Sequence, residues 1–293
     1  MRHHGVVHRW ILLSLLVCAC DGPVVTVDAA TRDAGGRPPD VIGPEDRPAR
    51  LFVPPAHDGV TELPLVVLLH GYTVDSFVQD LYFGMTRYAR SEGFYLLLPD
   101  GTLDADGEPH WDVIGAVVDD HAYLRGLIED VMAIAPVDPG DVSIVGHSNG
   151  AFMAYRLACD SADRVTSIAS LAGSDVIADC TPADDVSILE IHGNADGTVA
   201  YEGGSIAGLV FPAATDVVAT WAARVGCDTS ATTMGTPLDL TYDVDGAETS
   251  VLAYGDGCRA GVELWTMNGV DHIPSLQPAF TTTVLAWLRA HAR

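Results

Sequence analysis

The stretch that decides the fold is Val142-Ser143-Ile144-Val145-Gly146-His147-Ser148-Asn149-Gly150-Ala151. Its first residues are apolar and partly β-branched, as in a buried strand, and its end can continue as a helix over Asn149–Cys159. Between them lies the pattern G-x-S-x-G, a sharp turn that lifts the Ser148 hydroxyl to the helix N-terminus, where negative charge is favoured. Such a turn is strained, so Gly146 and Gly150 are expected where a Cβ would strike neighbouring elements. Ser148 is therefore a candidate nucleophile; the alternative is a plain strand-to-helix turn.

Short apolar runs recur on both sides of this stretch. Several are rich in β-branched residues and are followed by Gly, Pro, Asn or His, as in strands buried on both faces of a parallel sheet. Helical stretches such as Val118–Ile134 lie between them, and Pro278–His291 is expected to form the last helix. The alternation predicts an α/β fold with a doubly wound, mostly parallel sheet, helices on both faces and a site at the carboxyl ends of the strands. The runs are Leu63–Leu69, Phe94–Leu98, Val142–Val145, Val165–Leu171, Val186–Ile191 and Val262–Met267.

A serine hydroxyl is a weak nucleophile and needs a base, which an acid orients. After a nucleophile at this kind of turn, the acid and then the histidine follow along the chain. The run Ile188–Asp196 is a predicted strand ending in H-G-x-x-D, so Asp196 is the expected acid, and His272 before the last helix is the expected base. The alternatives are a turn-stabilising Asp196, a surface-loop His272, and Asp271 as the acid. Three histidines come too early to be the base and are expected to shape turns: His70, His147 and His192.

The tetrahedral intermediate of acyl transfer carries an oxyanion, which needs fixed N–H donors. One donor is expected from the backbone N–H of Asn149, directly after the nucleophile. The second is expected from the loop after an early strand. The run Leu65–Thr73 contains such a strand, ending in H-G, and we assign the Tyr72 N–H, with Thr73 close behind. The alternative is an ordinary exit from the strand, in which Gly71 serves only the turn.

The balance of charge excludes one class of partner. The chain has 15 basic residues, all of them arginine, against 40 acidic ones, and a formal net charge of −25. Such a surface repels a nucleic-acid backbone or an anionic lipid surface, so no nucleic-acid partner is expected. We interpret the acidity as a means of solubility, with neutral or cationic substrates fitting best.

The N-terminus is typical of an export signal. Two arginines accompany the apolar run Trp10–Val17, which is about half of the roughly 20 residues that span a bilayer. The run leads into Val17-Cys18-Ala19-Cys20, which resembles a bacterial lipoprotein signal, so residues 1–19 would be removed and Cys20 lipidated. The alternative is an ordinary cleaved signal. We expect an exported protein that is either lipid-anchored to the bacterial envelope through Cys20 or secreted.

Composition divides the remaining chain in two. Residues 20–47 are rich in Pro, Gly and Asp without a sustained period, which predicts a flexible linker. The pattern of apolar runs begins at residue 48. Since α/β folds of about 250 residues are often undivided, residues 48–293 are expected to form one catalytic domain.

Four cysteines lie in that domain. An even number in an exported chain suggests disulfides, and four cysteines allow three pairings. We favour the sequential pairs, Cys159–Cys180 and Cys227–Cys258. A metal site is the alternative, but no C-x-x-C or clustered Cys/His spacing supports it, so no metal is expected.

Six blocks of the sequence resemble, in order and at similar separations, the polyhydroxybutyrate depolymerase / feruloyl esterase family of secreted esterases. The resemblance covers nearly all of residues 50–272. It implies an α/β-hydrolase fold, hydrolysis of carboxylic esters, no cofactor, and the triad Ser148, Asp196 and His272. It also supports both cysteine pairs. The blocks are LVVLLHGYT (65–73), LLLPDGTLDADGEPHW (96–111), VDDHAYLRGLIEDV (118–131), VSIVGHSNGAFMAYRLACD (142–160), ILEIHGNADGTVAYEGG (188–204) and TWAARVGCD (220–228).

Two departures from the family pattern bear on substrate choice. Relatives usually carry Gly-His-x-Trp-Pro-Gly at the base, whereas this chain has Asp271-His272-Ile273-Pro274-Ser275, without the Trp that would line the site. Relatives often have paired cysteines shortly after the residue corresponding to Trp111, where this chain has Asp112-Val113-Ile114-Gly115.

The resemblance implies an exported serine carboxylesterase for a small-molecule or polymeric ester, acting through an acyl-enzyme. Two alternatives stay open, because one scaffold hosts several functions. The first is a peptidase or acyltransferase. The second is a hydrolase-like binding lipoprotein without catalysis, against which Ser148, Asp196 and His272 argue. The sequence makes no prediction of oligomeric state.

Overall fold

The structure is a computed structural model that describes residues 36–177 and 179–293. The predicted export signal, Cys20 and the first part of the predicted linker lie outside these residues. Among the helices that the structure describes, none is long and apolar enough to cross a membrane.

One large sheet runs through the described part of the chain, and its ten strands are hydrogen-bonded side by side. In chain order they are β1 (Val41–Ile42), β2 (Ala49–Phe52), β3 (Leu63–Leu69), β4 (Tyr95–Leu98), β7 (Val137–His147), β8 (Ser167–Leu171), β9 (Ser187–Gly193), β12 (Thr232–Met234), β13 (Thr249–Tyr254) and β14 (Val262–Met267). Two small hairpins lie outside it, β5 (Thr102–Leu103) with β6 (Pro109–His110) and β10 (Gly204–Ile206) with β11 (Leu209–Phe211).

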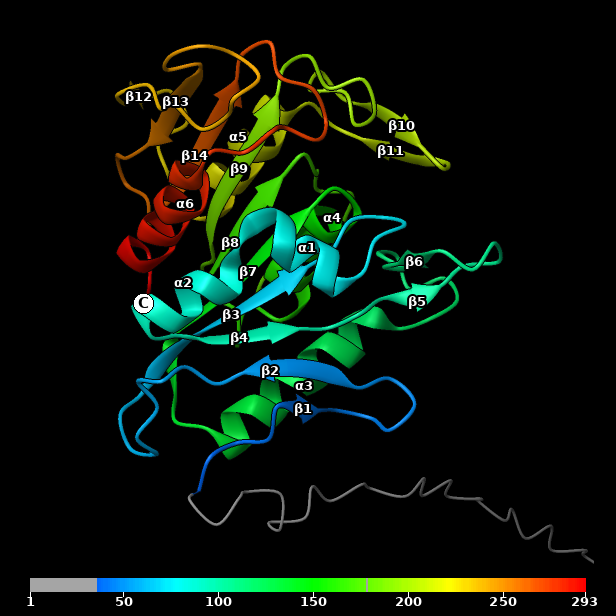
Figure 1. The fold of residues 1–293 in the computed structure, drawn as a ribbon. Coiled ribbons are helices and arrows are strands. Elements are labelled where there is room, and N and C mark those ends of the chain that lie inside the picture. The colour runs from blue at the N-terminus through cyan, green and yellow to red at the C-terminus, as the bar shows by residue number, and fades with distance from the viewer. Residues whose placement is uncertain (1–35, 178) are drawn as a thin grey trace, which may run out of the picture.

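The strand order is β1-β2-β4-β3-β7-β8-β9-β14-β13-β12, and the sheet twists strongly from one edge to the other (Figure 1). The central strands from β4 to β14 are parallel, and both edges are antiparallel. From β3 the chain first builds outward to β4 and then returns to β7 on the other side. The order therefore reverses between β3 and β7, and ligands of such sheets bind at the carboxyl ends of strands beside this point.

Helices cover both faces of the sheet (Figure 1). A buried apolar cluster on one face includes Leu127, Tyr155 and Trp221, and a second cluster on the other face includes Phe83 and Phe280. Residues of β3 alternate between the two clusters, as a strand buried on both faces requires. The first face is covered by α3 (Asp120–Ile134), α4 (Asn149–Asp160) and α5 (Ala214–Arg224), the second by α1 (Ser76–Phe83), α2 (Met85–Glu92) and α6 (Pro278–Ala290).

The predicted fold class is confirmed: this is an α/β-hydrolase sheet, doubly wound and mostly parallel. Each predicted apolar run overlaps a strand of the sheet, and the predicted helices overlap α3, α4 and α6. The antiparallel edge strands were not predicted. In β13 only alternate positions, such as Thr249 and Val251, are buried, so this strand lacks the continuous apolar run of a central one.

Structure begins earlier in the chain than the predicted linker boundary at residue 47. β1 pairs with β2, and Ile42 is buried. Arg47 forms an ion pair with the buried Asp120 at 2.5 Å, and its guanidinium lies 3.8 Å from the centre of the Tyr123 ring. Because these contacts join segments far apart in the chain, the local composition of residues 36–47 does not reveal them.

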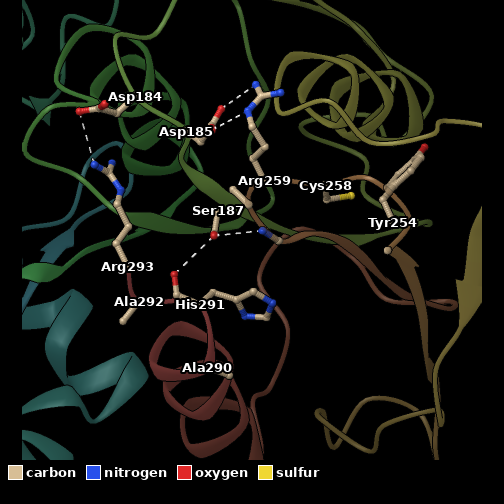
Figure 2. A pocket seen from close by; sticks show the side chains of 13 residues that line it. Asp184, Asp185, Ser187, Tyr254, Cys258, Arg259, Ala290, His291, Ala292 and Arg293 are labelled. Atoms are coloured by element: carbon tan, nitrogen blue, oxygen red, sulfur yellow. Dashed lines mark hydrogen bonds and ion pairs between the residues drawn. The ribbon is translucent and has the colours of Figure 1, made fainter.

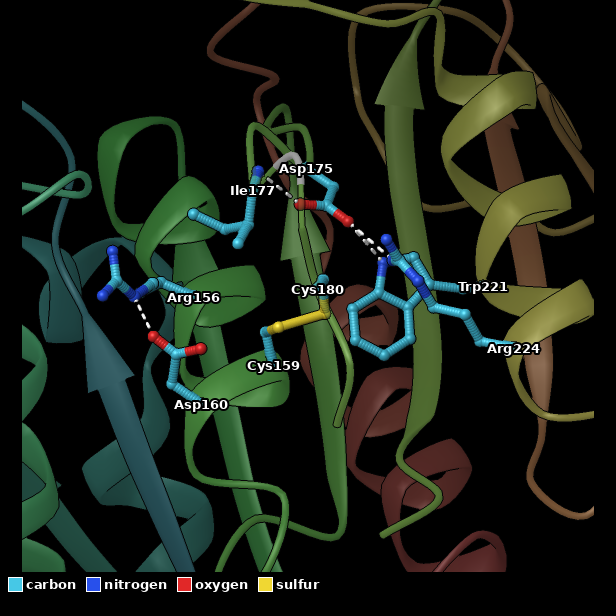
Figure 3. The surroundings of a disulfide bond; sticks show 8 residues. All are labelled: Arg156, Cys159, Asp160, Asp175, Ile177, Cys180, Trp221 and Arg224. Carbon is cyan, nitrogen blue, oxygen red and sulfur yellow. Dashed lines mark hydrogen bonds and ion pairs between the residues drawn. A yellow bond between two sulfur atoms is a disulfide. The ribbon is translucent and has the colours of Figure 1, made fainter. Parts of the chain in front are cut away.

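The structure contains both favoured disulfides, Cys159–Cys180 and Cys227–Cys258. The first joins the end of α4 to the loop after β8 (Figure 3). In the same loop, the Asp175 carboxylate accepts hydrogen bonds from Trp221 Nε1 at 3.0 Å and Arg224 Nη1 at 2.9 Å, both on α5. This loop is thereby tied to the helices on either side of it.

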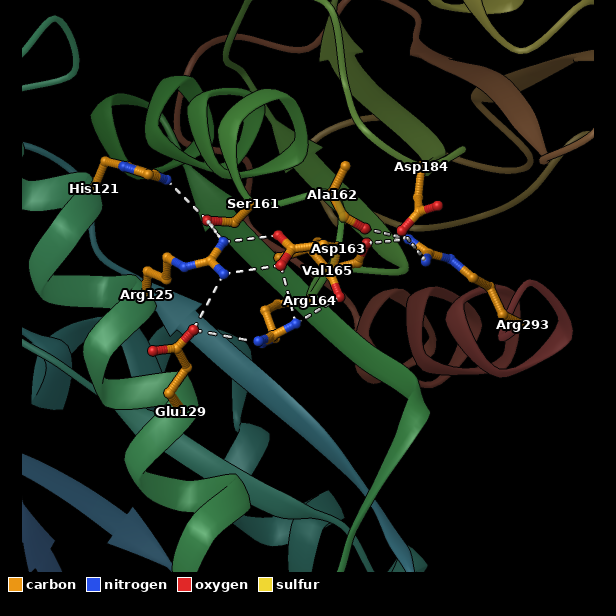
Figure 4. A network of polar contacts seen from close by, with 10 residues as sticks. All are labelled: His121, Arg125, Glu129, Ser161, Ala162, Asp163, Arg164, Val165, Asp184 and Arg293. Atoms are coloured by element: carbon orange, nitrogen blue, oxygen red, sulfur yellow. Dashed lines mark hydrogen bonds and ion pairs between the residues drawn. The ribbon is translucent and has the colours of Figure 1, made fainter.

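A polar network fixes the loop between α4 and β8 (Figure 4). Arg125 on α3 makes two hydrogen bonds to the Asp163 carboxylate, at 2.7 and 2.8 Å. Arg293 donates to the carbonyl oxygens of Ala162 and Val165, each at 2.6 Å. Since α4 starts at the carboxyl edge of the sheet, this network secures the opposite edge.

Candidate active site

Ser148 occupies the turn between β7 and α4 with φ of 53° and ψ of −120°. A positive φ is uncommon for a residue with a side chain and costs about 1–3 kcal/mol. The two glycines around it are required by space. A Cβ on Gly146 would lie 2.3 Å from the Gly150 carbonyl oxygen, and one on Gly150 would lie 2.5 Å from the carbonyl oxygens of Leu69 and His70. The strained, closely packed turn that the sequence predicted is therefore present.

The structure brings the three predicted residues into one hydrogen-bonded chain. His272 Nε2 lies 2.9 Å from Ser148 Oγ, and His272 Nδ1 lies 2.8 Å from Asp196 Oδ2. The three residues follow β7, β9 and β14, whose carboxyl ends meet at the same edge of the sheet. His272 and Asp196 are each only 7% exposed.

The partners of Asp196 keep it ionised. Its Oδ1 accepts hydrogen bonds from the N–H groups of Thr198 and Val199, both at 2.8 Å. Burial alone would raise the pKa of Asp196, but hydrogen bonds from His192 and His272 outweigh burial and hold it well below its usual range. An ionised Asp196 accepts the hydrogen on His272 Nδ1, so the lone pair on Nε2 faces the serine hydroxyl.

The alternative acid, Asp271, has different partners. Its Oδ1 accepts hydrogen bonds from the backbone N–H groups of His272 at 2.7 Å and Gly197 at 3.0 Å. These two hydrogen bonds lower the pKa of Asp271. The carboxylate is exposed and stabilises the loop, while the imidazole ring is bonded to Asp196.

The loop after β3 lies against Ser148. A Cβ on Gly71 would be 3.6 Å from Ser148 Cβ. Within the described residues, the backbone N–H groups of Tyr72 and Asn149 donate no hydrogen bond, whereas the Thr73 N–H donates to the Pro109 carbonyl at 2.9 Å. Tyr72 and Asn149 thus have free donors beside the serine, and Thr73 does not.

His70 fixes the orientation of the Tyr72 N–H. His70 Nε2 accepts from the Gly101 N–H at 2.8 Å, so the ring hydrogen is on Nδ1, which donates to the Gly71 carbonyl at 2.7 Å. In a trans peptide the C=O and the next N–H point in opposite directions, so the Tyr72 N–H points away from His70. Burial lowers the pKa of His70, which keeps this ring neutral.

Two side-chain contacts that the sequence analysis missed hold the neighbouring loop. The Asn149 side chain accepts from the Trp111 N–H at 2.7 Å and donates to the Trp111 carbonyl at 3.1 Å. The buried Trp111 indole in turn donates to the His70 carbonyl at 2.9 Å. These bonds connect both loops that carry the free N–H donors.

His147 supports the base. Its Nε2 lies 3.2 Å from the His272 carbonyl oxygen, and the two rings pack with centres 5.3 Å apart. Burial lowers the pKa of His147 to about 4, so a neutral ring donates this hydrogen bond. The role of shaping the turn, predicted for His147, thus includes holding the main chain of His272.

A buried polar group lies behind Asp196. His192 Nε2 is 3.3 Å from Asp196 Oδ2, and His192 Nδ1 is 3.0 Å from Glu190 Oε1. Burial alone would lower the pKa of His192, but hydrogen bonds to Asp196 and Glu190 raise it to about 10. Burial raises the pKa of Glu190, and hydrogen bonds from His192 and Tyr155 act in the opposite direction. Glu190 was not predicted, although a carboxylate inside an apolar strand signals a buried partner.

A cavity of about 550 Å³ lies at the opposite edge of the sheet (Figure 2). It is bordered by Ser187, the first residue of β9. Both of its arginines are paired, Arg259 with Asp185 at 2.7 Å and Arg293 with Asp184 at 3.5 Å. Because the cavity lies at the start of β9, whereas Asp196 follows the end of this strand, the cavity is separate from the candidate active site. In the parts of the chain that the structure describes, no group of three His, Cys, Asp or Glu residues is arranged to hold a metal ion.

Known proteins with similar sequences are esterases. No family model matches the chain. It is 29% identical over 179 residues to the "putative esterase NocK" of Nocardia uniformis, covering 59% of this chain and 52% of that relative. It is 27% identical over 205 residues to a "probable feruloyl esterase C" of Aspergillus terreus, covering 66% of this chain and 73% of the relative. The chain thus spans about half the length of the first relative.

A solved structure supports the fold. The acetyl xylan esterase of Aspergillus awamori superposes with a TM-score of 0.60 over 86% of this chain and 96% of its own. The two sequences are 16% identical, so this likeness concerns the fold. Sequence and structure together place the chain near feruloyl esterases and related α/β-hydrolases, as the sequence blocks indicated.

Proposed function

We propose that this chain, an α/β-hydrolase similar to feruloyl and other esterases, is an exported serine carboxylesterase that acts through an acyl-enzyme. The observation that carries the proposal is the hydrogen-bonded chain from Ser148 through His272 to Asp196. A hydroxyl, a correctly oriented imidazole and an ionised carboxylate in this order are the requirements of nucleophilic acyl transfer.

In the first half of the reaction, Ser148 Oγ attacks the ester carbonyl carbon while His272 Nε2 takes the serine proton. The ionised Asp196 stabilises the imidazolium that forms. The oxyanion of the tetrahedral intermediate accepts hydrogen bonds from the N–H groups of Tyr72 and Asn149, which have no other acceptor in the described residues. When the intermediate collapses, His272 gives its proton to the leaving alcohol and the acyl group stays on Ser148.

In the second half, water attacks the acyl-enzyme. His272 takes a proton from the water, the same two N–H groups bind the second oxyanion, and the proton returns to Ser148 Oγ as the carboxylic acid leaves. No step requires a cofactor, because the imidazole supplies every proton transfer.

The substrate class is proposed as a small-molecule or polymeric ester with an apolar part near the serine. Ile273, directly after His272, is 69% exposed, and Tyr72 on the opposite loop is 49% exposed. Ile273 adjoins the proposed base in the chain and Tyr72 carries a proposed oxyanion donor, so we propose that both side chains offer apolar surface to the substrate. The names of the relatives suggest feruloyl and acetyl esters as first substrates to test.

Export is proposed on two observations. The two disulfides fit an oxidising compartment. The apolar run Trp10–Val17, which leads into Cys20, is typical of an export signal. The predicted signal and Cys20 lie outside the described residues, and lipidation there is tested by labelling expressing cells with a palmitate analogue. Incorporation that is lost in Cys20→Ser supports the anchor, and secretion of unlabelled protein supports an ordinary cleaved signal.

The catalytic proposal is tested with nitrophenyl esters of rising chain length, beside methyl ferulate, acetylated xylan and polyhydroxybutyrate. We expect hydrolysis of at least one ester by the wild type and none above background by Ser148→Ala. Hydrolysis of a peptide anilide alone, or acyl transfer to an added alcohol in preference to water, would support a peptidase or an acyltransferase. A folded wild type that cleaves none of these substrates would support a binding role.

A further inference from the structure

The buried polar group behind Asp196 is more extensive than the proposed reaction needs. Asp196 Oδ2 already accepts the hydrogen bond from His272, yet His192 Nε2 lies 3.3 Å from the same oxygen. Glu190 Oε1 binds the other ring nitrogen of His192, and Glu190 Oε2 accepts from the Tyr155 hydroxyl at 2.8 Å. The side chains of Glu190 and His192 are at most 2% exposed.

The neighbours of His192 determine its protonation. Nδ1 faces the Glu190 carboxylate, and Nε2 faces both the Val199 carbonyl oxygen at 2.8 Å and the Asp196 carboxylate. The Val199 carbonyl oxygen can only accept, so Nε2 carries a hydrogen, and the ionised Glu190 carboxylate accepts from a hydrogen on Nδ1, so the ring is an imidazolium. A lone buried cation is costly, and Glu190 supplies the balancing charge.

The remaining groups around His192 do not change this assignment. The Tyr201 ring meets it edge-on with centres 5.7 Å apart, and the Tyr201 hydroxyl is paired with Thr266 Oγ1 at 2.8 Å. Thr266 is also the register partner of His192 on β14. The titratable or charged groups that face the ring directly or through one neighbour are Glu190, Asp196, Tyr155, Tyr201 and His272.

A positive charge at His192 allows two neighbouring buried carboxylates, Asp196 and Glu190, to stay ionised. Two buried carboxylates close together cannot both stay ionised without a cation between them. A protonated Asp196 could not accept the hydrogen on His272 Nδ1 or stabilise the imidazolium that forms during the reaction. The imidazolium of His192 allows Asp196 and Glu190 to be charged together.

We propose that His192, held as an imidazolium between Glu190 and Asp196, is a positioning residue that keeps Asp196 ionised and aimed at His272. Because His192 carries a positive charge and Glu190 a negative one, the two groups act on the His272 imidazolium in opposite directions. The pair therefore sets the pH above which His272 works as a base. This inference rests on the proposed function of the site.

Two matched variants test it, each removing one charge with little change of volume. His192→Gln removes the cation, which makes the His272 imidazolium easier to form. The acid limb of the pH profile of kcat/KM should move up by about half a pH unit or more. At pH 7, kcat should fall about tenfold with KM changed little, since Asp196 is less well oriented. In Glu190→Gln the amide oxygen can still accept from His192 Nδ1, and Asp196 still binds Nε2, so the cation stays while the negative charge of Glu190 is lost. The acid limb should therefore move down.

His121→Gln is the control. His121 is a partly buried imidazole bonded at 2.8 Å to Oγ of Ser161, which follows the C-terminal end of α4, whereas Ser148 precedes its N-terminal end (Figure 4). Its removal should leave the pH profile unchanged. A packing defect at His192 or Glu190 would move both profiles the same way or lower kcat without a shift, and either result would overturn the proposal.

A second measurement does not depend on activity. Nitrogen NMR of histidine-labelled wild type, with the His192 signal identified by its loss in His192→Gln, should show both ring nitrogens protonated at pH 8. A ring with one bare nitrogen at that pH contradicts the proposal. If the wild type cleaves no ester, the proposed function fails while this spectrum still decides the state of His192. If His192→Gln does not fold, the Glu190→Gln profile and the spectrum decide.

Discussion

Ser148 Oγ and His272 Nε2 lie 2.9 Å apart, although 124 positions separate the two residues in the chain. The strand order makes this possible, because β7 and β14 are separated in the sheet only by β8 and β9. The loops after these parallel strands emerge at the carboxyl ends of the sheet, and the loop after β9 brings Asp196 to the other ring nitrogen of His272. A hydroxyl, a base and an acid from three distant segments thus form one reactive unit.

The role of Asp196 can be tested by replacing its carboxylate with an amide of the same shape. Asp196→Asn would donate toward His272 Nδ1 instead of accepting from it, so the imidazole would turn the wrong nitrogen to the serine. We expect kcat for an activated ester to fall by about four orders of magnitude with KM changed little. Asp271→Asn is the matched control and should keep kcat within about threefold, because the Asp271 carboxylate bonds only backbone N–H groups. Equal losses in the two variants would contradict the assignment.

The space around Gly150 predicts a stability effect. An alanine Cβ there would lie 2.5 Å from two carbonyl oxygens of the neighbouring strand end and loop. We expect Gly150→Ala to lower the free energy of unfolding by about 3 kcal/mol or to prevent folding. Gly126→Ala on α3 has open space and should raise it by about 0.5–1 kcal/mol, because alanine favours the helix. Denaturant titration of both variants measures the difference, and similar stabilities would contradict the crowding at Gly150.

The raised pKa of His192 predicts how stability responds to alkali. The pKa rises from 6.5 to about 10, so the contribution of the charged ring is complete below pH 6.5 and is lost as pH rises toward 10. The stability advantage of the wild type over His192→Gln should therefore shrink steadily between pH 7 and pH 10. Urea unfolding of both proteins at four pH values measures this. A constant difference would show that the ring carries no charge in the folded state.

The disulfide at the end of α4 predicts a further loss of stability. Its cysteines are 21 positions apart, and closing such a loop restricts the unfolded chain by about 3 kcal/mol. The double variant Cys159→Ala, Cys180→Ala should unfold at lower denaturant concentration by a corresponding amount while keeping activity. Reduction of this variant would then report on Cys227–Cys258 alone. No change in the midpoint on removing the first pair would contradict its presence in the native protein.

The arrangement of the site could be predicted because each of its residues follows a strand with a visible apolar pattern. Ser148 lies in a turn whose glycines are required by neighbouring backbone, which makes the local sequence informative. Asp196 and His272 follow β9 and β14, two parallel strands whose buried residues leave little doubt about their position. The order of nucleophile, acid and histidine along the chain then assigns a role to each of the three residues.

Other parts depend on contacts that local sequence does not carry. The hydrogen bonds between the Asn149 side chain and the Trp111 backbone join residues 38 positions apart, and the hydrogen bond from Tyr155 to Glu190 joins α4 to β9. The same holds for Arg47, whose ion pair with Asp120 extends the folded region into the predicted linker. In each case the partner of the polar side chain lies on another element, distant in the chain.

The most direct test of the central claim is the site of covalent labelling. The folded wild type is treated with a fluorophosphonate, digested and examined by mass spectrometry. We predict one adduct, on Oγ of Ser148, formed fast in the wild type and slowly in Asp196→Asn. An adduct on a different residue, or no adduct on the correctly folded protein, would contradict the claim that Ser148 is activated by His272.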